Sequence, residues 1–357
     1  MFIDSGGASM VVPELPAHRP LQAPPRLKDV AAKVGVSTAT VSRALTGSGP
    51  VSSKTRQRVE EAAKELGFVP SHHASSLASG RSRNIGVVLP YVDRWFFATV
   101  LDGIAGTLTG AGYDAALYNL QGENFLESVL TDFLLRRHLD AAAVVSLRLD
   151  PSETEQLFSA GIPLAGIGGS LEGAPTVSVD DLDAGLRATN HLIELGHRRI
   201  AFVGGPPEAG RSFPMASDRR RGFERAMTAA GLEIDPRWLL VADFTFSGAY
   251  QRVKSLLAAP ADRPTAIFAA ADEMATGAIL AAANLGLQVP GDLSVIGIDA
   301  HPIGEAFGLT TVNQHARQQG TRAAQLLLQQ LSGDPVTASH ELHPTNFLVR
   351  SSTAPPV

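Results

Sequence analysis

Residues 37–43 place small polar side chains and one arginine at helical spacing. If they form a helix, Val41 faces a core and the outer face is formed by Thr38, Ala39, Ser42 and Arg43. Ser37 stands directly before this stretch, where its hydroxyl can cap the helix. Small polar groups with an arginine can read base edges in DNA, because arginine bonds guanine through two parallel hydrogen bonds. The alternative is a solvated basic face on an ordinary helical bundle.

Two short helices would have to position that face. Gly35 supplies a tight turn between them, and the apolar spacing predicts a small core made of Val30, Val34, Val36, Val41 and Leu45. A second helix that presents small polar groups and an arginine is the reading element of a helix-turn-helix.

A third helix is predicted after this pair. Ser52 or Ser53 can cap it, and Gly67 ends it. Its first turn carries three basic residues, which are Lys54, Arg56 and Arg58. These charges oppose the helix dipole, so helix stability does not explain them, whereas a DNA phosphate near the terminus would.

Charge is divided unevenly along the chain. Between Arg26 and Arg83 there are ten Lys and Arg against four Asp and Glu, although the whole chain carries a net charge of −5. Residues 1–25 contribute −1, so residues 84–357 carry −10. A basic segment joined to an acidic body is typical of a nucleic-acid reader attached to a domain with another task.

Three consecutive segments carry a family resemblance: VSTATVSRAL, TRQRVEEAAKELGFVP and ASSLASGRSRNIGVVLP. They resemble the DNA-binding head of the lactose/galactose-repressor family of bacterial transcription regulators. The later segments LGHRRIAFVGGP, RRRGFERAM, VPGDLSVIGID, LTTV and STAPP resemble the body of the same family. The resemblance implies an all-α helix-turn-helix domain at 26–70, a hinge helix or linker at 71–83, and an effector-binding and dimerisation domain at 84–357.

The expected partner of the head is double-stranded operator DNA with near-palindromic half-sites, bound by a homodimer. Thr38, Ala39 and Arg43 are expected to read bases. Phosphate contacts are expected from Ser37, Thr40, Ser42 and Thr55, together with the basic side chains, so that affinity falls steeply with salt.

Residues 71–83 contain Ala74-Ser75-Ser76-Leu77-Ala78, which is too short to form a stable helix alone in water. The resemblance implies that this segment folds when two copies pair over bent DNA, with Leu77 as a wedge in the minor groove. The alternative is a flexible tether with one incidental leucine.

The N-terminal residues and the overall composition exclude several classes of protein. Residues 1–25 hold five prolines with little apolar periodicity, which predicts a disordered leader without a secretion signal. An upstream start codon chosen in error and a genuine tail both explain that leader.

The chain has no cysteine, so disulfides and thiolate metal sites are excluded. No apolar run approaches the ~20 residues that span a bilayer, and a cytoplasmic location is expected.

From Asn84 onward, apolar runs alternate with amphipathic stretches. Strands are predicted at IGVVLP, DAALYN, AAAVV, IPLAGI, RRIAFVGG, TAIFAA and LSVIGID, and helices at 95–108, 181–195, 218–230 and 273–285. This alternation predicts parallel sheets covered on both faces, and the series restarts near Arg199, which indicates two similar lobes.

The resemblance implies a body like a periplasmic sugar-binding protein, with three segments crossing between the lobes near 180–181, 311–314 and 339–343. The first lobe is then expected at 84–180 and 314–338, and the second at 181–312 and 341–357. In open α/β sheets ligands bind beyond the carboxyl ends of the strands, which places the effector between the lobes.

Seven residues are expected to contact the effector. Tyr91, Asp93 and Phe96 follow the first strand, where aromatic rings suit stacking on a sugar or base. The resemblance assigns effector contacts to Arg219, Phe244 and Asp299, and Gln314 lies on a crossing segment. An arginine fork suits paired hydroxyls or a carboxylate, and a carboxylate accepts hydroxyl hydrogen bonds.

Five residues depart from the family pattern. Ala271 stands where the family usually has Asn, Ala300 replaces a frequent second acid, and Trp95 replaces a common Pro. Gly168 and Gly169 follow a strand where a polar residue is often presented to the ligand. The remaining arginine, aspartate and aromatic residues favour a sugar or sugar derivative over a base.

The sequence lacks a phosphate-binding loop with Lys-Ser/Thr and a Gly-x-Ser-x-Gly elbow, so no catalytic residue, cofactor or metal site is predicted. His340-Glu341-Leu342-His343 does not have the spacing of a zinc motif, and surface histidines are the better interpretation. The prediction is an effector-controlled transcription regulator, most simply a repressor. The alternative is a periplasmic-type sugar receptor without DNA binding, and an enzyme ranks third.

Overall fold

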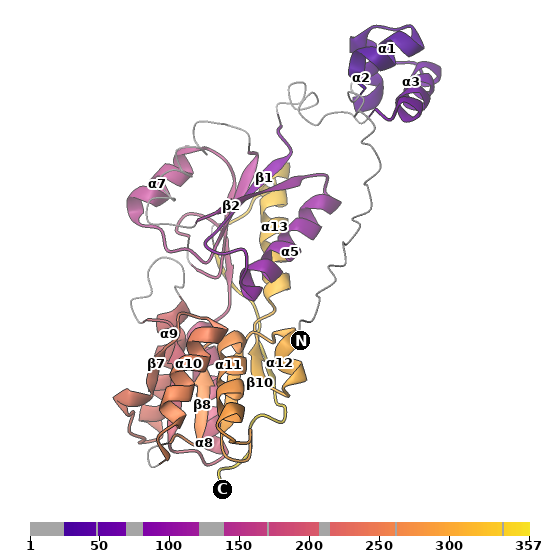
Figure 1. The fold of residues 1–357 in the computed structure, drawn as a ribbon. Helices are drawn as coiled ribbons and strands as arrows, with labels where there is room; N and C mark the ends of the chain where they lie inside the picture. The colour runs from indigo at the N-terminus through magenta and orange to yellow at the C-terminus, as the bar shows by residue number, and fades with distance from the viewer. Residues whose placement is uncertain are drawn as a thin grey trace, which may run out of the picture. The chain divides into compact units, whose positions relative to one another are not determined.

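The computed structural model describes residues 25–47, 49–68, 81–120, 139–169, 171–206, 215–260, 263–337 and 339–357. Residues 1–24 of the predicted leader at 1–25 and most of the predicted hinge at 71–83, Leu77 included, lie outside these residues. The chain divides into two compact units, Met1–Arg81 and Ser82–Val357 (Figure 1). In the described part of the chain, no helix is both long and apolar enough to cross a bilayer.

The described part of the first unit is a three-helix domain. Its helices are α1 (Leu27–Val34), α2 (Thr38–Thr46) and α3 (Ser53–Leu66). Gly35 has φ of +74°, a left-handed conformation that costs glycine little, and it ends α1 so that α2 can begin after a tight turn. The helices share a core of Val30, Ala31, Val34, Val41, Ala44, Val59, Ala62 and Ala63. The predicted helix-turn-helix head is confirmed.

The second unit contains two six-stranded sheets. The first has the order β11-β5-β4-β3-β1-β2 and the second β12-β10-β9-β8-β6-β7. The first sheet contains β1 (Asn84–Leu89), β2 (Asp114–Asn119), β3 (Ala141–Val145), β4 (Leu164–Ile167), β5 (Thr176–Ser178) and β11 (His340–Leu342). The second contains β6 (Ile200–Gly204), β7 (Leu239–Val241), β8 (Ala266–Ala269), β9 (Ser294–Ile298), β10 (Thr310–Asn313) and β12 (Asn346–Leu348). All pairs are parallel except β10 with β12.

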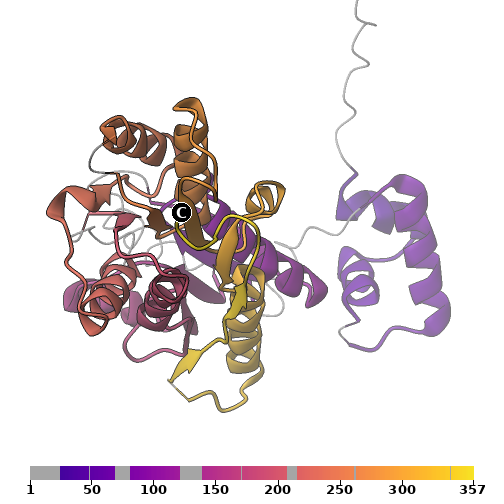
Figure 2. The ribbon, with the colours of Figure 1, turned by 90° about the horizontal axis from the view of Figure 1, so that it is seen from below.

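Helices cover both faces of each sheet, as buried parallel strands require. On the first sheet, Ile85, Val87 and Leu89 pack toward α5 (Trp95–Gly110) and α13 (Ala316–Ser332). Val88 points to the other face, where α7 (Pro151–Ser159) lies. On the second sheet, α8 (Asp181–Glu194) and α9 (Met215–Ala229) pack together on one face, and α10 (Phe246–Leu257) and α11 (Asp272–Asn284) on the other (Figure 2). Two short elements, η1 (Pro236–Trp238) and α12 (Pro302–Ala306), complete this lobe.

Glycines let paired helices approach closely. A Cβ at Gly103 of α5 would lie 2.1 Å from the carbonyl oxygen of Arg317 in α13, and one at Gly320 would lie 2.2 Å from that of Val100. The backbones of α5 and α13 are therefore in direct contact, which fixes how the last long helix packs on the first lobe.

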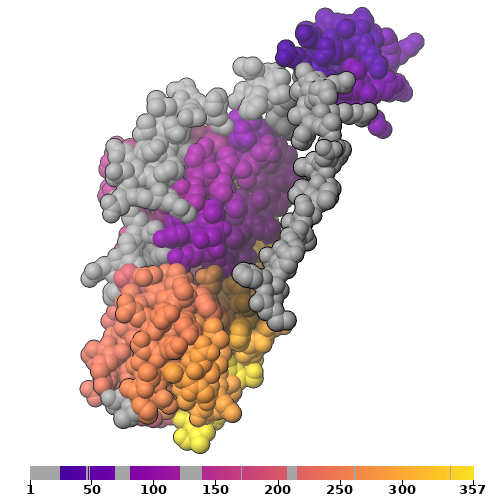
Figure 3. All heavy atoms as spheres, viewed as in Figure 1, coloured from indigo at the N-terminus to yellow at the C-terminus, as the bar shows by residue number. Residues whose placement is uncertain are grey.

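The chain crosses between the lobes three times. The first two crossings lie between β5 and α8 and between β10 and α13, close to the predicted positions. The third lies later than predicted, because β11 pairs with β5 of the first sheet from His340 to Leu342. Residues 341–342, which were assigned to the second lobe, therefore belong to the first, and the crossing follows them. In Figure 3 the atoms of the two lobes meet along a boundary across the body.

Candidate functional site

The second helix of the head presents the predicted face. Ser37 caps α2, because its hydroxyl accepts a hydrogen bond from Thr40 N at 3.1 Å. Thr38, Ala39 and Arg43 are exposed, whereas Thr40 and Ser42 are half-buried. The Thr40 hydroxyl lies 2.9 Å from that of Ser37, so both oxygens sit at the helix start.

Arg43 lies beside the turn after α2. A Cβ on Gly49, whose φ is +95°, would lie 3.4 Å from Arg43 Cδ. The aliphatic part of the side chain therefore runs along the backbone there, while the residue as a whole stays exposed. An exposed arginine on the second helix of a helix-turn-helix, here in the last turn of α2, has the position needed to reach a base edge.

The third helix is capped by Ser52, not Ser53, since Ser52 Oγ accepts from Thr55 N at 3.2 Å. One of its early basic residues makes a hydrogen bond within the head: Arg58 Nη2 donates to Val34 O at 2.8 Å. Val34 is the last residue of α1, where a cation is favoured by the helix dipole. This contact explains the charge at Arg58 without a phosphate.

A cavity of about 40 Å³ lies between the lobes at the carboxyl ends of the strands. Five of the predicted effector residues line it, and these are Phe96, Arg219, Phe244, Asp299 and Gln314. They come from the loop after β1, from α9, from the turns after β7 and β9, and from the second crossing. Residues far apart in the sequence thus meet at one place.

Two predicted residues lie elsewhere. The Tyr91 ring packs 6.0 Å from that of Phe97 and 4.7 Å from the Arg94 guanidinium, and it does not line the cavity. Asp93 is exposed and lines a separate hollow of about 390 Å³ with Arg94, Glu273 and His301. The structure therefore does not bring Tyr91 and Asp93 to the cavity that the other five share.

The polar groups of the cavity are bonded to one another. Arg219 Nε donates to Asp181 Oδ1 at 2.7 Å, and Arg219 Nη1 donates to Ala270 O at 2.5 Å. Gln314 Nε2 donates to Asp299 Oδ1, and the backbone oxygen of Gln314 accepts from Gln319. A buried arginine needs such partners, and a ligand that displaced them would have to supply equivalent hydrogen bonds.

Strained backbone conformations occur at the ends of three strands. Ser146 after β3, Phe244 after β7 and Asp299 after β9 have φ values of +50°, +54° and +138°. Non-glycine residues adopt this region rarely and at a cost of about 1–3 kcal/mol each, and such residues cluster at ligand sites. Phe244 and Asp299 both line the cavity.

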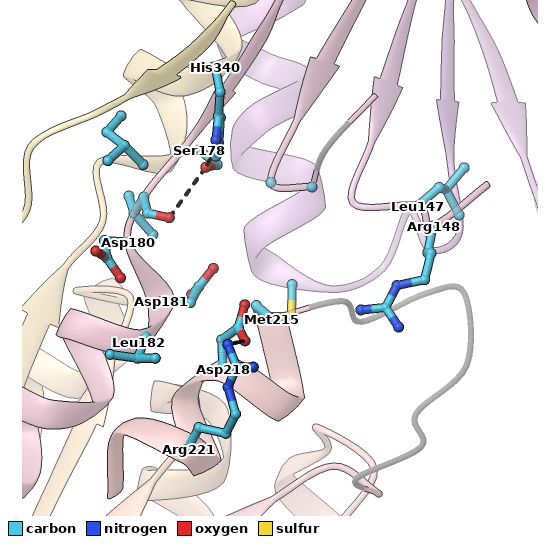
Figure 4. Close-up of a pocket in the computed structure, with 14 residues that line it drawn as sticks. Leu147, Arg148, Ser178, Asp180, Asp181, Leu182, Met215, Asp218, Arg221 and His340 are labelled. Atoms are coloured by element: carbon cyan, nitrogen blue, oxygen red, sulfur yellow. Dashed lines mark hydrogen bonds and ion pairs between the residues drawn. The ribbon is translucent and has the colours of Figure 1, made fainter. Parts of the chain in front are cut away.

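A larger hollow of about 490 Å³ adjoins the cavity, because Met215 lines both. Arg148 enters it from the first lobe, opposite Asp181 and Asp218 of the second (Figure 4). Gly168 and Gly169 also line it and add no side chain, which leaves room at the end of β4. Together the two spaces form a polar cleft with charges of both signs.

Comparison with known sequences identifies both parts of the chain. The sequence model "Bacterial regulatory proteins, lacI family" matches residues 26–71, and "Periplasmic binding protein-like domain" matches residues 189–353. The HTH-type transcriptional repressor CytR of Escherichia coli K12 is 35% identical over 331 residues, which are 92% of this chain and 96% of CytR. The HTH-type transcriptional regulator CelR of Thermobifida fusca is 32% identical over 92% of this chain and 98% of its own.

The chain belongs to the LacI family of bacterial regulatory proteins. It is a DNA-binding transcription regulator with a helix-turn-helix head and a two-lobed body. Among solved structures, a lac repressor dimer bound to operator and an anti-inducer matches with a TM-score of 0.79 and 28% identity over 93% of this chain and all of that one. A CelR–cellobiose complex matches with a TM-score of 0.67 and 31% identity over 92% and 99%. The receptor alternative does not account for the matched head.

One buried residue of this LacI-family body was missed by the sequence interpretation. Asp272 accepts from Thr311 Oγ1 and from His301 N, both at 2.8 Å, and it is fully buried. It thereby holds the turn that carries Asp299 and Ala300, whose φ is +60°. A signal existed, because Asp272 stands two residues after the predicted strand at 265–270 and directly before the predicted helix at 273–285.

Burial raises the pKa of both carboxyl groups beside this turn. The pKa of Asp272 is raised to about 7 and that of Asp299 to about 8, because burial outweighs their hydrogen bonds and the nearby Arg219 and Arg350. Burial also raises the pKa of Asp181, although its partner Arg219 opposes this. The cleft therefore changes its charge within the physiological pH range.

The body of this regulator is expected to lose stability as the pH rises from about 6.5 to 8.5. Asp272 and Asp299 keep their protons in the folded state up to about 7 and 8, whereas the unfolded chain loses them near 3.8. The folded state thus binds more protons here, so stability falls with rising pH. Burial lowers the pKa of four histidines below 6.5, and these are His191, His197, His301 and His343. Their titration therefore affects the stability of the folded state mainly below pH 6.5.

The midpoint of urea unfolding at pH 6.5, 7.5 and 8.5 measures this effect, and Asp299→Asn should flatten the trend. A midpoint that stays constant or rises over this range would show that the two carboxyl groups are ionised in the folded state.

Proposed function

We propose that two copies of this chain bind a near-palindromic operator through their heads, and that a small molecule in the cleft of the body controls this affinity. The observation that carries the proposal is the exposed row Thr38, Ala39 and Arg43 on a capped second helix. Half-sites about one helical turn apart, ~34–36 Å, are the general expectation for helix-turn-helix dimers. The lac repressor structure is described as a dimer bound to operator, which supports this arrangement.

Within the head, Thr38, Ala39 and Arg43 are proposed to read bases. Ser37, Thr40, Ser42 and Thr55 are proposed to contact phosphates, with Lys54 and Arg56 as cations of the third helix. Ser37 and Thr40 bond each other at the start of α2, where backbone N–H groups and the helix dipole favour an anion. Because Arg58 binds the end of α1, it is not counted among the phosphate contacts.

Leu77 is proposed to insert into the minor groove at the centre of the operator. Apolar wedges kink DNA by roughly 20–90° and allow a protein to contact more of it. Leu77→Ala should then weaken operator binding strongly and leave ligand binding by the body unchanged, as measured by gel shift and calorimetry. Unchanged operator affinity would favour a simple tether.

The proposed effector is a sugar or a sugar derivative. Phe96 and Phe244 offer aromatic faces, and Arg219, Asp299 and Gln314 offer hydrogen bonds that suit neighbouring ring hydroxyls. CelR is described in complex with cellobiose. We further propose that the body binds this molecule without converting it, and that the protein acts in the cytoplasm, where its DNA partner is found.

A gel shift with DNA from upstream of the protein's own gene tests the proposal. A specific complex is expected, and its affinity should fall linearly on a logarithmic scale with salt, with a slope of about −0.9 for each phosphate neutralised. Calorimetric screening of sugars and nucleobases identifies the effector, which should then change the shift. If upstream and unrelated DNA of equal length bind equally at every salt concentration, the proposed operator function is contradicted.

A further inference from the structure

One wall of the small cavity is built by residues from both lobes. Arg94 and Glu273 line the cavity of about 40 Å³ and also the outer hollow of about 390 Å³. They therefore separate the two spaces. Arg94 belongs to the loop after β1 in the first lobe, and Glu273 to the first turn of α11 in the second.

Arg94 contacts both lobes at once. Its Nη1 donates to Phe244 O at 2.5 Å and to Asp243 O at 3.1 Å in the second lobe. In the first lobe its guanidinium lies 4.7 Å from the centre of the Tyr91 ring, which is a cation–π contact. Asp243 and Phe244 have φ of +50° and +54°, so a strained turn presents both carbonyl groups to the arginine.

Glu273 takes the place of a missing helix cap. Arg94 is the N-cap residue of α5, but its side chain makes no cap hydrogen bond. Instead Glu273 Oε1 accepts from Trp95 N at 3.2 Å, so a carboxylate of one lobe meets the helix start of the other. The Trp95 ring lies 5.0 Å from the ring of His301, which also belongs to the second lobe.

We propose that Arg94, Trp95 and Glu273 form a latch that stabilises the closed arrangement of the two lobes and has to release when the body opens. The inference rests on the proposed function, since it concerns the same cleft. Ligand pockets usually measure about 300–1,000 Å³, and a single water occupies about 30 Å³ of liquid. The cavity of about 40 Å³ is too small for a sugar by itself, whereas the adjoining hollow of about 490 Å³ falls within this range. Release of the latch would widen the part of the cleft that Phe96, Phe244 and Asp299 line.

The latch contributes to the balance between closed and open bodies. Each charged hydrogen bond that exists only in the closed state shifts this balance by about tenfold when it is removed. Weakening the latch should therefore populate the open body, and Trp95, which is half-buried in the closed body, should become more accessible to solvent.

The chain carries its own reporter for this opening. Trp95 and Trp238 are its only tryptophans, and Trp238 is buried in the second lobe. In the full-length Trp238→Phe variant, fluorescence quenching by acrylamide reports on Trp95 alone. At pH 8 His301 is neutral, because burial lowers its pKa from 6.5, so imidazolium quenching does not contribute.

Arg94→Ala and Glu273→Ala should each raise the acrylamide quenching constant of Trp95 severalfold, and Arg94→Lys should raise it less. Arg237→Ala removes an exposed charge of η1, which directly precedes β7 at the amino ends of the strands and away from the cleft, and should leave the quenching constant unchanged. If Trp238→Phe does not unfold cooperatively, the same comparison is made as the difference between the two-tryptophan protein and its Trp95→Phe variant.

Equal quenching of Trp95 in the parent and in both alanine variants would overturn the latch. This result would not contradict the proposed operator function, because the experiment contains no DNA and no effector. Conversely, a full-length protein that failed to shift operator DNA would contradict the proposed function, while the quenching data would still decide the latch.

Discussion

Replacing Arg43 with alanine is expected to lower operator affinity by about 10- to 100-fold, with a much smaller loss on unrelated DNA. A good bidentate contact to a base contributes about 1–3 kcal/mol of discrimination, and each 1.4 kcal/mol is a factor of ten. Arg43 is exposed on α2, and its aliphatic stem lies beside Gly49, so truncation leaves the core of the head in place. Competition gel shifts with operator and scrambled DNA measure both affinities.

Lys54→Ala is the matched control for Arg43. Lys54 is an exposed cation at the start of α3 and is proposed to contact phosphate. Its removal should weaken binding to both DNAs by a similar factor and reduce the salt dependence by about one phosphate. If Arg43→Ala behaved like Lys54→Ala, Arg43 would be a phosphate contact and the assignment of base reading to it would be wrong.

Replacing Arg219 with leucine is expected to destabilise the body by about 3–5 kcal/mol, because it leaves the buried carboxylate of Asp181 without its partner. The side chain of Arg219 is 4% exposed, and that of Asp181 is 12% exposed. Arg219 also lowers the pKa of Asp299, so its loss makes a second buried acid more costly to ionise. Urea unfolding monitored by circular dichroism measures the loss.

Two variants test the cause of that loss. Arg221→Leu changes the same helix, where Arg221 pairs with Asp218 but is 58% exposed, and it should cost about 0–1 kcal/mol. Adding Asp181→Leu to Arg219→Leu should recover much of the stability, because no charge of the pair then remains buried. Equal effects of Arg219→Leu and Arg221→Leu would show that the pair is solvated in solution.

The long elements of the fold were predictable because their patterns are local. Ile85, Val87 and Leu89 alternate with residues on the other face, and Gly35, Gly67 and Gly286 each follow a helix in a left-handed conformation. The short strands β5, β7, β10 and β11 were not predicted. Each has three or four residues, and β11 is held by pairing with β5, which lies more than 150 residues earlier. Such pairing leaves no local periodicity to detect.

The candidate site was predictable only in part. The resemblance pointed to Arg219, Phe244 and Asp299, and the structure places all three at one cavity. The composition of the loop after β1 suggested Tyr91 and Asp93, but composition does not show which way a side chain turns. The partners of Arg219 and Asp299 depend on the crossing of the chain between lobes. Asp181 and Gln314 could therefore not be paired with them from the sequence.

Selection of bound sites from a random DNA pool tests the central claim most directly, namely that the head reads DNA and the body does not. The full chain and the unit Ser82–Val357 are compared at the same salt concentration. The full chain should enrich one near-palindromic site, and the isolated body should enrich none. If the body alone enriched the same site, or if the full chain enriched no sequence, the assignment of DNA reading to the head would be contradicted.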